Sequence, residues 1–247
     1  MTAPISTTPR IAFAGRILIV GSGAVSRCLQ PLLLRHVDMD AGRITVVDID
    51  DVSALIPETI AAGVTFRQVE ITPESFATDA LTEFVGPGDL LLNLAWNIDA
   101  GTIIGWCQAR GVMYLDTSVE EWDPYREVER PQERTLYHRH LALREQATSW
   151  PANGPTAVVE HGANPGLVSH WVKRALLEIT AEILDGPARD GSAGEIDADR
   201  RTRLTDALAG RDFAALAMET GTKVIHISER DTQISSDPKR PGEFVNT

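Results

Sequence analysis

A glycine-rich turn between an apolar strand and a helix constrains the fold of this chain most. Residues 17–20 are a short apolar run rich in β-branched side chains, typical of a strand buried on both faces of a parallel sheet. Residues 21–26, GSGAVS, follow directly and approach the fingerprint G-x-G-x-x-G. The first glycine permits a tight turn and the second lets the backbone approach a pyrophosphate. The third position needs a small residue, and here it is Ser26.

The residues after this turn favour a dinucleotide site. A helix is expected to begin at the turn and to continue past Pro31, and its first N–H groups would face the phosphates. A second apolar strand at 44–47 ends at Asp48, whose carboxylate can accept ribose hydroxyls and would repel a 2′-phosphate. The prediction is therefore NAD rather than NADP, although a glycine turn that binds no nucleotide is the alternative. The predicted cofactor-binding residues of this segment are Gly21, Ser22, Gly23, Ala24, Val25 and Asp48.

Helical and extended patterns keep alternating after Asp48. Strands are expected at 64–69, 89–94, 112–116 and 156–160, and helices at 52–62, 72–85, 99–110 and 135–147. This alternation predicts an α/β fold with a Rossmann-type doubly wound parallel sheet, in which ligands bind beyond the carboxyl ends of the strands. The polar residues expected at that edge, besides the turn and Asp48, are Asn93, Asp116, Thr117 and Glu120.

Prolines and glycines near residues 151–155 predict a linker. It would divide the chain into a cofactor-binding domain, 1–155, and the start of a second, α+β domain, 156–247. In the second part we expect a helix beginning at Pro165 with Asn164 at its N-cap, and a loop at 186–211 with some helix near 203–208. A short helix after Asp212 and a strand at 223–227 should follow. The chain stops without a closing element, so this domain is expected to be incomplete.

Charge and composition exclude several classes of protein. The net charge of −12 disfavours nucleic acid and anionic membranes as partners and suits a cationic substrate. The two cysteines, Cys28 and Cys107, form no disulfide or zinc pattern and are interpreted as small core residues. No metal site, membrane span or secretion signal is predicted, and a cytoplasmic location follows by default.

Three strings of the sequence resemble bacterial homospermidine synthase, within the wider saccharopine-dehydrogenase-like proteins. They are YLDTSVEEW at 114–122, GANPGLVS at 162–169 and IHISERDTQ at 225–233, and the closing FVNT at 244–247 fits as well. The resemblance covers nearly the whole chain from about Ile17. It corresponds to the N-terminal part only, because members of the family continue well past Thr247.

The resemblance implies an enzyme that keeps NAD bound while it oxidises putrescine to an imine, transfers the aminobutyl group to a second diamine and reduces the product with the same hydride. By motif match, Glu120 would bind the substrate ammonium, Asn164 would lie at the junction of nicotinamide and substrate, and Glu229 would be a second acid able to relay the amine proton. Asn93 and Thr117 would complete the cofactor site. The implied partners are putrescine or a related diamine, with a homodimer as a candidate assembly. Weak or no full turnover is expected from this chain alone.

Two other functions stay open at this point. One is an NAD(P)-dependent oxidoreductase of the saccharopine dehydrogenase type, and the other is a non-catalytic NAD-binding fragment. For two side chains, two interpretations also remain open. His161 either lines the cleft or is structural, and Trp122 either packs in the core or forms a wall of the amine site. His226, in the predicted last strand, is interpreted as structural.

Overall fold

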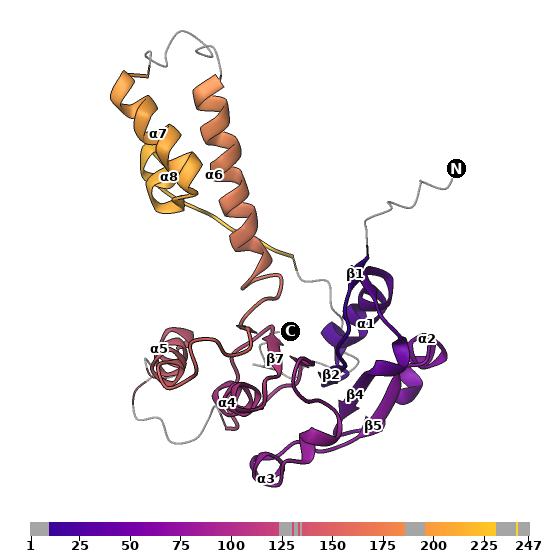
Figure 1. The fold of residues 1–247 in the computed structure, drawn as a ribbon. Helices are drawn as coiled ribbons and strands as arrows, with labels where there is room; N and C mark the ends of the chain where they lie inside the picture. Colours follow the sequence, from indigo (N-terminus) through magenta and orange to yellow (C-terminus); the bar gives the residue numbers. More distant parts are fainter. Residues whose placement is uncertain are drawn as a thin grey trace, which may run out of the picture. The chain divides into compact units, whose positions relative to one another are not determined.

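The computed structural model describes residues 10–123, 130, 133, 135–185, 196–230 and 241 (Figure 1). The chain divides into two compact units, Met1–Leu167 and Val168–Thr247. The sixth predicted strand and the GANPG segment after it therefore lie in the first unit.

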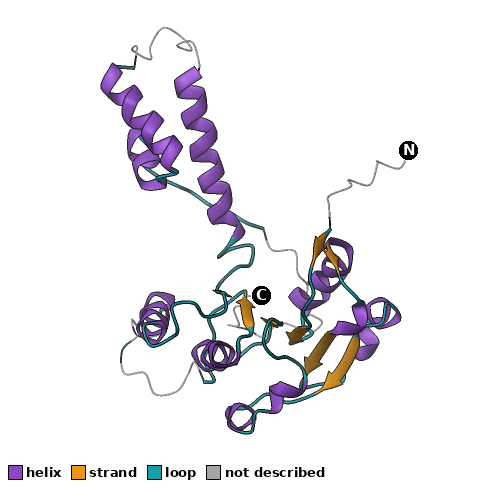
Figure 2. Cartoon of the chain, in the orientation of Figure 1, coloured by secondary structure: helices purple, strands orange, loops and turns teal. Residues whose placement is uncertain are grey.

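The first unit is built on one parallel sheet of six strands in the order β5-β4-β2-β6-β7-β8 (Figure 2). This order confirms the predicted doubly wound sheet, because the chain runs outward from β2 in one direction and then from β6 in the other. A small two-stranded parallel sheet of β1 and β3 was not predicted. The strands are β1 (Ile11–Ala12), β2 (Ile17–Val20), β3 (Val37–Asp38), β4 (Ile44–Asp48), β5 (Thr65–Gln68), β6 (Leu90–Asn93), β7 (Met113–Asp116) and β8 (Ala157–Val158).

Helices cover both faces of this sheet. The side chains of β2 alternate: Ile17 and Ile19 pack with residues of α1, whereas Leu18 and Val20 face the core formed with α3 and α4. A strand buried on both sides explains the unbroken apolar run of the sequence. The helices of this unit are α1 (Ala24–His36), α2 (Pro57–Ala61), α3 (Pro73–Ala77), α4 (Ala100–Arg110) and α5 (Leu136–Ala147), with 3₁₀ turns η1 (Ala41–Arg43), η2 (Ser53–Leu55) and η3 (Ala80–Glu83).

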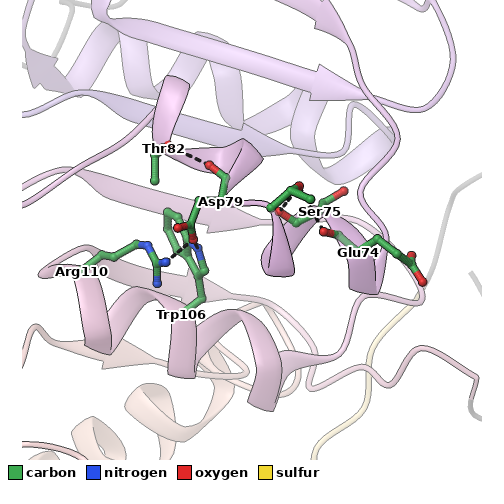
Figure 3. A network of polar contacts seen from close by, with 7 residues as sticks. Glu74, Ser75, Asp79, Thr82, Trp106 and Arg110 are labelled. Carbon is green, nitrogen blue, oxygen red and sulfur yellow. Dashed lines mark hydrogen bonds and ion pairs between the residues drawn. The ribbon is translucent and has the colours of Figure 1, made fainter.

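Two of the predicted helices are shorter in the structure. The one expected at 72–85 is interrupted at Asp79, whose φ is +56°, and so divides into α3 and η3. Figure 3 shows the reason: the Asp79 carboxylate lies between Arg110 and the Trp106 ring N–H, both on α4. A charged partner from another helix thus outweighs local helix propensity. The helix expected at 52–62 is reduced to η2 and α2.

The second unit is helical in its described residues. Its helices α6 (Leu167–Asp185), α7 (Ala198–Gly210) and α8 (Phe213–Glu219) enclose a small core of Leu176, Ala207 and Leu216. The helical character expected near 203–208 is confirmed, but α7 extends beyond it on both sides, so the loop predicted there is wrong. Asp197 caps α7 by accepting from the Arg200 N–H at 2.7 Å. Residues 186–195 and 231–240 lie outside the described residues, and so do 242–247 with the closing FVNT string.

The strand predicted at 223–227 is also wrong. The segment has no sheet partner among the described residues, and the Val224 side chain is 79% exposed. Apolar alternation alone does not make a strand when no neighbouring strand supplies hydrogen bonds. The helices are therefore the regular secondary structure described in Val168–Thr247, where a strand was expected as well.

The two cysteines differ in environment. Cys107 is buried in the core, and burial raises the pKa of its thiol to about 12. Cys28 is exposed on α1, so its interpretation as a core residue is wrong.

The described residues hold no group of three side chains able to ligate a metal ion, and none of their helices combines the length and apolar character needed to cross a bilayer.

Candidate functional site

The glycine turn lies at the point where the sheet changes direction, between β2 and β6. Gly21 has φ +89° and donates its N–H to the Val47 carbonyl at 2.8 Å. A Cβ on Gly21 would lie 2.8 Å from the backbone nitrogen of Ala95, which follows β6. Only glycine therefore fits here, both for its backbone conformation and for the close approach of the two strand ends. Ligands of doubly wound sheets bind at this switch point.

The first turn of α1 is open to an anion. Gly23 is the N-cap and supplies no side-chain acceptor, and the first turn contains no acidic residue. Gly23, Ala24 and Val25 are exposed, and a Cβ on Gly23 would meet nothing within 4 Å. The unpaired N–H groups and the positive end of the helix dipole can therefore receive a phosphate. Ser26 is fully buried and accepts a hydrogen bond from Gln30 at 3.1 Å, so serine fits the third position of the fingerprint.

Asp48 ends β4 beside this turn. Its Oδ2 accepts from the Ser22 N–H at 2.6 Å, and its Oδ1 accepts from the Asp50 N–H at 3.1 Å. The carboxylate is half-buried and keeps further lone pairs for ribose hydroxyls. Ser22 is almost fully buried and its N–H is bonded to Asp48, so it fixes this carboxylate beside the turn.

A second group of polar residues joins the ends of β6, β7 and β8. The Asn93 side-chain amide donates to the Tyr114 hydroxyl at 3.3 Å, and that hydroxyl donates to Asp116 Oδ2 at 2.8 Å. Asp116 Oδ1 accepts from the Glu160 N–H at 2.6 Å, and the Asp116 carbonyl accepts from the His161 N–H at 2.9 Å. Asn93 and Asp116 are both buried. They therefore hold the sheet edge together from inside, and neither carboxylate oxygen of Asp116 is free.

Burial raises the pKa of Asp116 to about 6. The negative charges of Glu160 and Glu120 raise this pKa too, whereas the bonds from the Glu160 N–H and the Tyr114 hydroxyl lower it. Asp116 therefore takes up a proton just below neutral pH, and the edge gathers three carboxyl groups within electrostatic reach of one another.

Replacing Asp116 with asparagine should flatten the pH dependence of stability. The pKa is higher in the folded chain, about 6, than its ordinary value of 3.8, so the proton stabilises the fold at low pH and this contribution disappears as the pH rises through 6. Relative to Asp116→Asn, the wild type should lose about 1 kcal/mol of unfolding free energy between pH 5 and pH 7. Urea unfolding of both proteins at the two pH values measures this. A difference that stays constant with pH would show that Asp116 has an ordinary pKa.

Glu120 and Thr117 follow β7 at the same edge. Glu120 is half-buried; its Oε1 accepts from the Ser118 hydroxyl at 2.7 Å, and its carbonyl accepts from the Ala100 N–H at 3.0 Å. Thr117 is half-buried and lies next to Gly162. Both predicted positions are thus near Asp116. Trp122 packs edge-on against Phe76, with ring centroids 5.9 Å apart.

The GANPG segment forms a closed loop after β8. The Gly162 N–H donates to the Pro165 carbonyl, and the Leu167 N–H returns to the Gly162 carbonyl, both at 2.9 Å. Helix α6 begins at Leu167, so the prediction that Asn164 is its N-cap is wrong. Asn164 instead lies within the loop, in the same unit as the sheet edge.

Glu229 lies in the second unit, in an exposed segment without regular secondary structure. His226 is exposed in the same segment.

The sequence analysis did not select three residues of the edge: Tyr114, His140 and Glu160. Glu160 follows β8 and could have been found by the rule that selected Asp116, whereas no sequence pattern marks His140 on α5.

The chain is similar to a known domain family and to several homospermidine synthases. Residues 17–158 match the family of the saccharopine dehydrogenase NADP binding domain. Homospermidine synthases of Blastochloris viridis and Mesorhizobium japonicum are 35% and 30% identical over 94% of this chain, but over only 46% and 45% of their own lengths. The crystal structure of the Legionella pneumophila homospermidine synthase in complex with NAD has a TM-score of 0.69 and 28% identity, covering 94% of this chain and 44% of that one. The chain thus spans less than half the length of these relatives.

Proposed function

Because this chain belongs to the family of the saccharopine dehydrogenase NADP binding domain, we propose that it binds NAD and acts in a homospermidine synthase-like reaction. The observation that carries the proposal is the match of 94% of the chain to homospermidine synthases, one of them solved with NAD. The geometry supports it independently, since an open helix N-terminus and a rim of carboxylates meet at one sheet edge.

The residues of the turn fit a dinucleotide. The backbone N–H groups of residues 23–25 would hold the pyrophosphate over Gly23, where the structure leaves space, and Asp48, which already accepts the Ser22 N–H, would accept the ribose hydroxyls. Asn93 supports this edge by accepting the Ala95 N–H on its Oδ1 at 3.3 Å. When bound, NAD would supply a hydride acceptor that returns the hydride within the same cycle.

The description of the family refers to NADP, but Asp48 at the end of β4 favours NAD in this chain. Asp48 and the neighbouring Asp50 and Asp51 place negative charge where a 2′-phosphate would lie. We therefore assign NAD as the cofactor of this chain.

In the proposed reaction, putrescine is oxidised to an imine, a second diamine displaces ammonia from it, and the new imine is reduced by the same hydride, so the net redox change is zero. The acidic rim suits a dication, because buried carboxylates offset the loss of its hydration. Glu120 would bind an ammonium group, with Thr117 beside the cofactor. By the motif match, Asn164 would lie at the nicotinamide–substrate junction and Glu229 would take part in proton transfer.

One assay distinguishes this function from its alternatives. The protein is incubated with NAD and putrescine, and both homospermidine and NADH are measured. Homospermidine without accumulated NADH supports the proposal. Stoichiometric NADH would indicate a saccharopine dehydrogenase-type oxidoreductase, and NAD binding without any product would indicate a non-catalytic fragment.

Replacing Glu120 with glutamine should weaken putrescine binding while NAD binding is unchanged. The loss of one charge-assisted hydrogen bond predicts about a 10-fold higher Kd for putrescine. Titration calorimetry of the NAD-loaded protein measures it. Glu121→Gln is the matched control, because that carboxylate pairs with Arg139 at 3.4 Å instead. Equal putrescine affinity in Glu120→Gln and the wild type would remove Glu120 from the amine site.

A further inference from the structure

Glu160 is held in an unusual position directly after β8. Its φ of +53° is uncommon for a residue other than glycine and persists only when its surroundings fix it. Here the Asp116 carboxylate accepts the Glu160 N–H at 2.6 Å, and the Asp116 carbonyl accepts the next N–H, of His161. The direction of the Glu160 side chain is therefore set by a buried residue of the candidate site.

One oxygen of the Glu160 carboxylate lacks a hydrogen-bond donor. The side chain is only 9% exposed, and its Oε2 lies 2.9 Å from Nε2 of His140 on α5. Its Oε1 is buried and accepts no hydrogen bond from any described residue. Buried carboxylate oxygens normally accept hydrogen bonds, so a donor is missing at this position.

The surrounding charge favours a cationic donor over a neutral one. Asp116 is close enough to Glu160 and Glu120 for both charges to raise its pKa. A positive group at Glu160 would relieve this repulsion. The imidazole of His140 presents one ring nitrogen to one oxygen, whereas a primary ammonium carries three N–H donors and can bond to both.

The partner of this carboxylate can move. His140 lies on α5 with its side chain 38% exposed, and rotation of the ring away from Glu160 would free Oε2, the oxygen that it contacts. We propose that Glu160 is a binding site for a primary alkylammonium group, which takes the place of the His140 imidazole. This inference rests on the proposed function for the identity of the ligand, a diamine, and adds a second ammonium site to that of Glu120.

Titration calorimetry with putrescine tests the site in the NAD-loaded protein. Glu160→Gln keeps the size of the side chain and the backbone bond to Asp116, and it should raise the Kd for putrescine about 10- to 100-fold. Glu145→Gln, an exposed position on α5, removes the same charge and should bind as the wild type does. The neutral analogue 1,4-butanediol should bind to none of the three proteins. Equal putrescine affinity in Glu160→Gln and the wild type would overturn the assignment.

A second variant tests the exchange with His140. If the ammonium replaces the imidazole, His140→Ala should bind putrescine at least as tightly as the wild type. A weakening of tenfold or more would mean that the Glu160–His140 pair has another role, and would contradict the proposal. In the wild type, the NMR signals of the His140 ring should shift on addition of putrescine but not of butanediol.

The outcomes separate this site from the proposed reaction. Putrescine binding that depends on Glu160, without homospermidine as a product, would refute the reaction and leave the site. Homospermidine formation with full activity in Glu160→Gln would refute the site and leave the reaction. A wild-type protein that binds no putrescine would refute the site, while the product assay would still decide the reaction.

Discussion

Replacing Gly21 with alanine should abolish measurable NAD binding and destabilise the first unit. The new methyl group would lie 2.8 Å from the Ala95 nitrogen and 2.9 Å from both the Ala95 Cα and the Leu94 carbonyl carbon. These are backbone atoms of the neighbouring strand end, which cannot rotate away. Together with the positive φ, the clash should lower the free energy of unfolding by about 3 kcal/mol. Thermal unfolding and NAD titration measure the two effects.

Gly23→Ala is the matched control for Gly21→Ala. Gly23 has φ −71°, and a Cβ there would meet no protein atom within 4 Å. The variant should therefore keep the stability of the wild type and lose NAD affinity alone, because the methyl group would occupy space assigned to the pyrophosphate. If Gly23→Ala binds NAD as tightly as the wild type, the phosphates do not lie over this turn.

Replacing Asp48 with alanine should produce the second large effect. The change removes the acceptor for the Ser22 N–H and the proposed acceptor for the ribose hydroxyls. Each hydrogen bond to a charged acceptor contributes on the order of 2 kcal/mol, so the Kd for NAD should rise about 30- to 100-fold. The affinity for NADP should fall less or improve, because the charge that repels its phosphate is gone. Titrations with both cofactors give the ratio.

Asp48→Asn separates the two roles of this carboxylate. Its amide oxygen can still accept the Ser22 N–H, the shorter of the two backbone bonds, whereas the bond from the Asp50 N–H and the charge are lost. It should therefore discriminate less against NADP than the wild type while binding NAD better than Asp48→Ala. An unchanged preference for NAD in both variants would place the ribose elsewhere.

The sequence predicted the sheet because its signals are local. Apolar runs of four or five residues, a glycine turn and a helix after each strand are sufficient to specify β2, β4, β6 and β7 and the doubly wound class of their sheet. The break at Asp79 could not be predicted in this way, since the groups that hold it, Arg110 and Trp106, belong to a helix far along the chain.

The second unit was predicted less well. Helix α7 is mostly polar and buries only Leu204 and Ala207, so its periodicity is weak, although Asp197 at its N-cap was a readable signal. The segment 223–227 shows the opposite error, because its apolar alternation is strong but the described structure gives it no neighbouring strand.

The candidate site was partly predictable. The rule that polar residues after parallel strands face a ligand selected Asn93, Asp116 and Glu120. It could not select Tyr114, which lies inside β7 and reaches the edge only through the length of its side chain. His140 was equally hidden, because its pairing with Glu160 depends on where α5 packs.

The buried Tyr114 hydroxyl has a single hydrogen, so its hydrogen bonds with Asn93 and Asp116 can run in only one direction. Because Tyr114 gives that hydrogen to Asp116, Asn93 must offer Tyr114 its NH₂ group and turn its oxygen toward Ala95. The amide of Asn93 thus has one allowed orientation. An aspartate at this position would place a carboxylate oxygen, which is an acceptor, against the lone pairs of the Tyr114 hydroxyl oxygen, which is an acceptor too. The direction of these hydrogen bonds is thus fixed across the two neighbouring strands β6 and β7, and Asn93 cannot be exchanged for the isosteric aspartate without losing its bond to Tyr114.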